Sequence, residues 1–232
     1  RAATLEGGYR AYRRAVVARL AAPPALRFRV ICGATGSGKS RLLEALATHG
    51  LQVLDLERLA CHRGSVLGDL PGEPQPSQKM FDSRVWAALQ RFDPARAVFV
   101  EAESRKIGQL QVPSALLERM REGECLRLEV NLAERVRFLM DEYRHFLAAP
   151  SVLEEKLRCL TDLYGHAVID RWVAQAVAGA WAALVADLLA NHYDPAYRRA
   201  AARNYLHYDE ARVLPVESLD RARPRHLDDD VE

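Results

Sequence analysis

Short apolar runs and helical spacing alternate along the first half of this chain. An apolar run at 26–32 precedes a glycine-rich turn, and leucines at helical spacing follow over 41–47, where Gly50 ends the pattern. Three further apolar runs predict strands, at 52–56, 97–100 and 124–130. Strands that alternate with helices predict an α/β fold with a parallel sheet.

From Ala133 onward the pattern is mostly helical. Several apolar residues share one face of the first helix: Val136, Leu139, Met140, Tyr143 and Leu147. Residues 151–154 fit a capping box, and Asp194-Pro195 predicts an N-cap followed by proline in the first turn. Residues 172–189 are almost entirely apolar, but Gln175 and Asp187 interrupt them, so they predict a buried helix and no membrane span.

The two ends of the chain differ from its middle. A helical pattern before residue 21 is followed by a proline-containing linker, a further helix is expected at 78–92, residues 213–216 predict a last strand, and 228–232 are acidic. We therefore expect three parts: 1–24 as a terminal helix with a linker, 25–132 as an α/β core, and 133–232 as a helical region with a possible final strand.

Composition narrows the class of protein only slightly. The chain has 232 residues, 49% of them hydrophobic, and a net charge of +2, so no overall basic field indicates nucleic acid. Its four cysteines are scattered without a C-x-x-C pair, which argues against a zinc site or a disulfide framework and for the reducing cytoplasm. We see no signal peptide.

One motif carries most of the functional information. Residues 33–40 fit G-x-x-x-x-G-K-[ST], the phosphate-binding P-loop, between a predicted strand and a predicted helix. Glycines let successive N–H groups point into one concave nest, and the helix N-terminus favours anions. The predicted phosphate-binding residues are Gly33, Thr35, Gly36, Ser37, Gly38, Lys39 and Ser40. The fold class is thus P-loop NTPase-like, a parallel sheet flanked by helices.

Charged residues follow the predicted strands, where ligands of parallel sheets bind. We expect Mg²⁺ at Ser40 together with carboxylates at the strand ends, Asp55 (with Glu57 nearby), Glu101 and Glu103. For each carboxylate alone, a solvated surface charge is an equal alternative. Lys39, Arg63 and Arg105 are the candidate catalytic residues, because lysine and arginine stabilise charge on phosphate.

The last predicted helix carries Arg198, Arg199 and Arg203 beside several tyrosines. Arginines neutralise phosphates and aromatic rings stack on unpaired bases, so we expect this helix to bind RNA. An ordinary amphipathic helix with a solvated arginine face explains the pattern equally well.

Taken together, six blocks in this order resemble the bacterial tRNA 2-selenouridine synthase family. The blocks are GATGSGKS at 33–40, LDLE at 54–57, HRGS at 62–65, QPSQ at 75–78, ESRKIG at 103–108 and HYDPAY at 192–197. In addition, LEGGY at 5–9 resembles the end of a rhodanese domain, which in that family precedes the P-loop domain. The resemblance implies that 1–24 ends such a domain and that the chain is the C-terminal P-loop portion of a longer enzyme.

The resemblance also implies a transferase activity. Such enzymes replace sulfur by selenium in wobble 2-thiouridine of tRNAs of the Lys, Glu and Gln type. They first geranylate the sulfur with geranyl diphosphate and then exchange the S-geranyl group for selenium from selenophosphate, which a separate enzyme produces. A rhodanese-loop cysteine is the expected selenium carrier, and none of the four cysteines here lies in such a loop. We therefore expect this chain alone to lack the selenium-transfer step.

Two alternatives from other classes stay open. The predicted strand end at Asp55-Leu56-Glu57 resembles the acceptor-binding carboxylates of shikimate-type P-loop kinases, so the chain could be a small-molecule kinase. A nucleotide-gated RNA-binding module without chemistry is the other alternative. The sequence does not distinguish ATP, GTP and geranyl diphosphate as the P-loop ligand.

Overall fold

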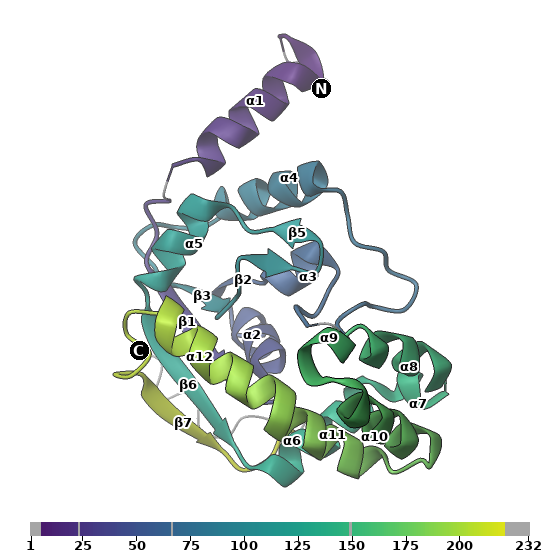
Figure 1. The fold of residues 1–232 in the computed structure, drawn as a ribbon. Coiled ribbons are helices and arrows are strands. Elements are labelled where there is room, and N and C mark those ends of the chain that lie inside the picture. The colour runs from purple at the N-terminus through teal and green to yellow at the C-terminus, as the bar shows by residue number, and fades with distance from the viewer. Residues whose placement is uncertain (1–5, 23, 66, 149, 221–232) are drawn as a thin grey trace.

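A five-stranded, wholly parallel sheet forms the centre of the computed structural model, which describes residues 6–22, 24–65, 67–148 and 150–220 (Figure 1). In spatial order the strands are β2 (Gln52–Leu54), β3 (Val98–Glu101), β1 (Phe28–Gly33), β6 (Glu124–Val130) and β7 (Arg212–Val216). The predicted P-loop NTPase-like α/β fold is confirmed. The predicted acidic tail at 228–232 lies outside the described residues.

Successive side chains of β1 point to opposite faces of the sheet, and both faces are buried. Val30 and Cys32 belong to a core shared with helices on one face, whereas Ile31 packs on the other face with Leu43 and Leu46 of α2 (Lys39–Thr48). The helices that contribute to the first core are α1 (Gly8–Leu20), α3 (Leu56–Ala60), α4 (Gln78–Leu89), α5 (Ser114–Arg121) and α12 (Asp194–Asn204). Both faces of β1 are therefore covered, which fixes the turn that follows it.

Helix α1 lies at one end of the molecule against α4 (Figure 1). Val16 is fully buried there, and Arg13 forms an ion pair of 2.9 Å with Asp82.

Strand β7 forms one edge of the sheet, where it pairs with β6. It therefore adds a strand from the third predicted part, 133–232, to the sheet. The division into 1–24, 25–132 and 133–232 stays a prediction.

The helices after β6 build a second core. Their bounds are α6 (Leu132–Glu142), α7 (Arg144–Ala148), α8 (Pro150–Arg158), α9 (Thr161–Tyr164), α10 (His166–Val177), α11 (Trp181–Leu188) and the π-helix η1 (Leu189–Tyr193). Leu157, Trp172 and Leu184 are buried at its centre. No helix in the described part of the chain is long and apolar enough to cross a membrane.

Several predicted helix boundaries are wrong. Residues 172–189 form parts of two helices, because the chain turns at Gly179 with φ +68°. Helix α8 already contains Ser151, so this residue is no N-cap. Asp194 begins no separate helix either, since the chain is helical from Trp181 through η1 to Asn204, and its carboxylate pairs with Arg135.

Other differences concern short elements. The second strand ends at Leu54, and Asp55 instead caps α3 (Leu56–Ala60) by accepting the Arg58 N–H at 2.8 Å. Helix α4 ends at Leu89, three residues before the predicted end. Sequence analysis missed α3, α5 and the hairpin of β4 (Lys106–Ile107) and β5 (Leu110–Gln111). These elements are too short to show a clear period.

Candidate active site

The phosphate loop joins β1 to α2, as predicted. Gly36 and Gly38 have φ of +78° and +79°, in the left-handed region. A Cβ on Gly36 would lie 2.8 Å from Cδ1 of Leu139, and one on Gly38 would lie 2.5 Å from Cδ2 of Leu219. The backbone conformation therefore favours glycine at both positions. Side chains of α6 and of the C-terminal segment (217–220) also pack closely over the loop there.

Two distant helices hold the start of the loop. The Gly33 N–H donates to the hydroxyl of Tyr197 on α12 at 2.7 Å. Arg135 on α6 donates from Nε to the Thr35 carbonyl at 2.8 Å and forms a two-pronged ion pair with Asp194, at 3.0 and 2.6 Å. Arg135 is only 6% exposed, so its guanidinium lies inside the protein.

Sequence reasoning about single residues missed Arg135, Asp194 and Tyr197 as parts of the site. The signal that points to two of them is the block at 192–197, which lies far from the loop in sequence but against it in the fold.

Lys39 lies at the first residue of α2, with its side chain turned back over the loop. Its ammonium donates to the carbonyls of Gly33 at 2.8 Å and Ala34 at 3.4 Å. The same nitrogen is 3.5 Å from Oε1 of Glu101 and 5.5 Å from the centre of the Tyr197 ring. The cation is thus held between the loop and the first carboxylate of the site.

Three carboxylates converge beside this lysine. Glu57, Glu101 and Glu103 each offer an oxygen, and these oxygens lie within 4.8 Å of one another. The Ser40 hydroxyl donates to Glu57 at 3.4 Å. Burial raises the pKa of all three carboxyls; repulsion from Glu101 adds to this for Glu57 and Glu103, while Lys39 opposes it.

Three of the predicted metal ligands therefore lie together: Ser40, Glu101 and Glu103. Glu57 completes the group from α3, whereas the predicted ligand Asp55 caps that helix. An all-oxygen donor set with excess negative charge fits a hard divalent cation such as Mg²⁺. The metal assignment stays a prediction.

The predicted arginines occupy different environments. Arg63 lies in the cleft, where it donates to the Glu142 carbonyl at 3.0 Å, pairs with the Glu142 carboxylate at 3.0 Å, and lies 4.9 Å from the centre of the Tyr143 ring. Arg105 is exposed on the turn before β4 and is not among the residues that line the cleft. The three candidate RNA-binding residues are exposed on α12, Arg198, Arg199 and Arg203.

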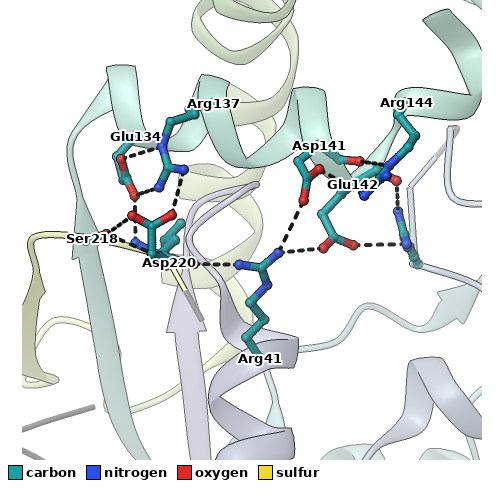
Figure 2. Close-up of polar contacts among 10 residues, drawn as sticks. Arg41, Glu134, Arg137, Asp141, Glu142, Arg144, Ser218 and Asp220 are labelled. Atoms are coloured by element: carbon teal, nitrogen blue, oxygen red, sulfur yellow. Dashed lines mark hydrogen bonds and ion pairs between the residues drawn. The ribbon is translucent and has the colours of Figure 1, made fainter. Parts of the chain in front are cut away.

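Figure 2 shows how α6 and the C-terminal segment are tied to α2. Arg41 pairs with Glu142 at 3.0 Å and donates to the Leu219 carbonyl. The Leu219 N–H donates to Glu134 at 2.6 Å, and Arg137 pairs with both Glu134 and Asp220. Arg137, followed by the Leu219 N–H, lowers the pKa of Glu134 to about 2, so the tie persists in mild acid.

Two cavities meet at the phosphate loop. The larger is a cleft of about 2440 Å³ that contains the loop, the three carboxylates and Arg63. The smaller is an apolar pocket of about 70 Å³ among the helices after β6, and its lining includes Phe146, Trp181, Leu184 and Val185. Five residues line both cavities: Thr35, Ser65, Leu139, Tyr143 and Tyr193. The apolar pocket therefore adjoins the cleft beside the phosphate loop, with these five residues at their common boundary.

The chain is similar to known proteins. Residues 26–156 match the family model described as tRNA 2-selenouridine synthase AAA domain. Proteins named tRNA 2-selenouridine synthase are similar to the chain: that of Marinobacter nauticus is 38% identical over 142 residues, and that of Shewanella halifaxensis is 32% identical over 178.

These alignments cover 60% and 75% of this chain but 37% and 46% of the two relatives. A third, from Aeromonas salmonicida, is 38% identical over 144 residues, which is 61% of this chain and 38% of that protein. The chain thus spans less than half the length of the curated relatives it matches. Because the family model covers more than half of the residues, the chain belongs to the tRNA 2-selenouridine synthase AAA domain family.

Proposed function

We propose that this chain is the P-loop portion of a tRNA-modifying transferase, in which it binds geranyl diphosphate and transfers the geranyl group to the sulfur of wobble 2-thiouridine. The observation that carries the proposal is the apolar pocket that adjoins the phosphate loop, with Thr35 in the walls of both cavities. A nest for phosphates beside an apolar pocket suits a ligand with a diphosphate head and a hydrocarbon tail.

The diphosphate would lie in the nest formed by residues 33–40. Backbone N–H groups and the N-terminus of α2 provide partial positive charge, and Lys39 provides a full one. Charge on the diphosphate grows as the C–O bond breaks, so donors fixed in advance lower the barrier. Arg63 lines the same cleft and is held by Glu142, in position to meet an outer phosphate. We propose Lys39 and Arg63 as catalytic residues, and leave Arg105, which lies outside the cleft, with no assigned step.

Ser40 with Glu57, Glu101 and Glu103 would hold Mg²⁺ beside the diphosphate. The bound cation would supply further charge neutralisation at the leaving group. Without a cation, burial and mutual repulsion keep the pKa values of these carboxyls raised.

The hydrocarbon chain would enter the apolar pocket. Its volume of about 70 Å³ takes only the tip of a geranyl chain, and the remainder would lie along the junction with the cleft. The pocket thus favours a short prenyl chain over a long one.

The substrate would be tRNA, as the names of the relatives state for those proteins. The exposed arginines of α12 would contact its phosphates, since α12 also holds the phosphate loop through Tyr197.

Selenium transfer from selenophosphate would need a longer synthase that also includes a rhodanese domain. We propose that this synthase acts in the cytoplasm. Of the described residues that line the cleft, none is a cysteine.

Calorimetric titration with geranyl diphosphate and, separately, with ATP tests this proposal, both in the presence of Mg²⁺. We expect geranyl diphosphate to bind and the Lys39→Ala variant to lose that binding, because the loop then lacks its full positive charge. Lys79→Ala, which removes an exposed lysine of α4, is the matched control and should bind as the wild type does.

ATP binding without any response to geranyl diphosphate would overturn the proposal and favour a kinase or a nucleotide-gated RNA-binding module. Phosphate transfer from ATP in the absence of RNA would then identify the kinase.

A further inference from the structure

The junction between the cleft and the apolar pocket determines where chemistry would occur. If the diphosphate lies in the loop and the prenyl chain in the pocket, the carbon that joins them lies at the junction. This inference rests on the proposed function. The side chains that wall the junction are those of Thr35, Ser65, Leu139, Tyr143 and Tyr193. Two of the five are aromatic.

The two tyrosine rings are not equivalent. One face of the Tyr143 ring already carries the guanidinium of Arg63, 4.9 Å from the ring centre, and Glu142 holds that guanidinium at 3.0 Å. The Tyr193 ring instead contacts His192, with ring centres 4.5 Å apart and planes at 69°. Burial lowers the pKa of His192, so this neighbour is neutral near pH 7, and burial raises the pKa of Tyr193, which stays a neutral phenol.

Transfer of a prenyl group places positive charge on the junction carbon. The sulfur of 2-thiouridine forms a bond to the allylic carbon, the carbon–oxygen bond breaks, and its electron pair leaves with the diphosphate. The pyrimidine releases its N3 proton to solvent. In a loose transition state the allylic carbon carries part of a positive charge, which an aromatic ring face attracts.

We propose that Tyr193 is a catalytic residue whose ring contacts the allylic carbon and stabilises the positive charge that develops there during transfer. Tyr193 is the last residue of the π-helix η1, directly before helix α12, which continues toward Tyr197 and the loop. A π-helix inserted in a longer helix frequently marks a functional position.

Phe146 supplies a matched control from the same pocket. It is buried and aromatic and stacks on Tyr143, with ring centres 6.0 Å apart. Phe146 lines the apolar pocket but does not line the cleft. Its ring would therefore contact the prenyl chain at a distance from the reacting carbon. Replacing it by leucine should raise KM and leave kcat nearly unchanged.

The experiment measures kcat and KM for geranyl transfer from geranyl diphosphate to an RNA stem-loop that carries 2-thiouridine. Tyr193→Phe keeps the ring and should keep kcat within about threefold, whereas Tyr193→Leu should lower kcat by about 10- to 30-fold with a smaller change in KM. Phenylalanines with one, two and three ring fluorines at position 193 keep the shape but weaken the ring's attraction for cations. Their kcat values should fall stepwise with each fluorine.

A fluorine series with constant kcat, or equal losses in Tyr193→Phe and Tyr193→Leu, would overturn the assignment even if Tyr193→Leu folds poorly. Wild-type protein that binds or transfers no geranyl group would instead overturn the proposed function. The two failures are therefore distinguishable in one set of assays.

Discussion

The buried ion pair between Arg135 and Asp194 offers a quantitative test of how the phosphate loop is held. Arg135 bridges the Thr35 carbonyl and the Asp194 carboxylate, with bonds of 2.6 to 3.0 Å. Asp194→Asn keeps the size of the side chain and removes its charge, so a buried guanidinium loses its counter-charge. The resulting loss in the free energy of unfolding depends on how much of the ion pair is exposed to water.

Removing one partner of a fully buried pair costs about 3–5 kcal/mol. The Arg135 side chain is 8% exposed, but the Asp194 side chain is 23% exposed, so water compensates part of the loss. We therefore expect Asp194→Asn to reduce the free energy of unfolding by about 2–3 kcal/mol. Because Arg135 then no longer fixes the Thr35 carbonyl, diphosphate affinity should fall as well.

Urea unfolding monitored by circular dichroism measures the first effect and calorimetry with inorganic diphosphate measures the second. Glu154→Gln, which breaks the exposed i,i+4 pair with Arg158, is the control and should change the free energy of unfolding far less than Asp194→Asn does. A loss below about 1 kcal/mol in Asp194→Asn would refute the reasoning, since this is the size expected of a surface pair.

Three more predictions concern other parts of the site. Tyr197→Phe leaves the Gly33 N–H without its acceptor, so the free energy of unfolding should fall by about 1–3 kcal/mol in urea titrations, and an unchanged value would show that another acceptor replaces the hydroxyl. The pKa of Glu134 is lowered from 4.5 to about 2, so its contribution to stability is present above pH 4.5 and is lost as pH falls toward 2. Glu134→Gln should accordingly be less stable than the wild type at pH 6 and equally stable near pH 2, whereas a difference that does not depend on pH would contradict the ion-pair account. Last, RNA binding measured against salt should show a shallower dependence, by up to about 2–3 units of log–log slope, when alanine replaces the exposed arginines of α12, Arg198, Arg199 and Arg203. An unchanged slope would place the RNA elsewhere.

Local patterns in the sequence predict the sheet and the phosphate loop well. Strand β6 has the predicted bounds, because its apolar residues and flanking turns are all local signals. The loop at 33–40 lies between β1 and α2 for the same reason. The tertiary contacts that hold the loop are not local, and no spacing rule connects Tyr197 with Gly33, 164 positions away.

Helix boundaries in the second half depended on backbone features that polarity patterns do not show. The apolar run at 172–189 reads as one helix, yet Gly179 adopts a positive φ and divides it. Asp194 looks like an N-cap from its neighbours, but its partner is Arg135, 59 residues away. Asp55, which the sequence predicts as a metal ligand, caps a short helix and lies outside the group of three glutamates, and its role toward a metal stays a prediction.

The central claim is that one ligand spans both cavities, with phosphates at the loop and hydrocarbon in the apolar pocket. Val185→Trp would fill the pocket from a position outside the cleft, since Val185 lines the pocket and does not line the cleft. A pocket of about 70 Å³ takes two to three methylene-sized groups, so filling it should remove about 2 kcal/mol of binding.

The most direct measurement is therefore the affinity of Val185→Trp for geranyl diphosphate and for inorganic diphosphate, each relative to the wild type. We predict that geranyl diphosphate binds about 30-fold more weakly while inorganic diphosphate binds as before. Equal losses for both ligands, or no loss for geranyl diphosphate, would contradict the account.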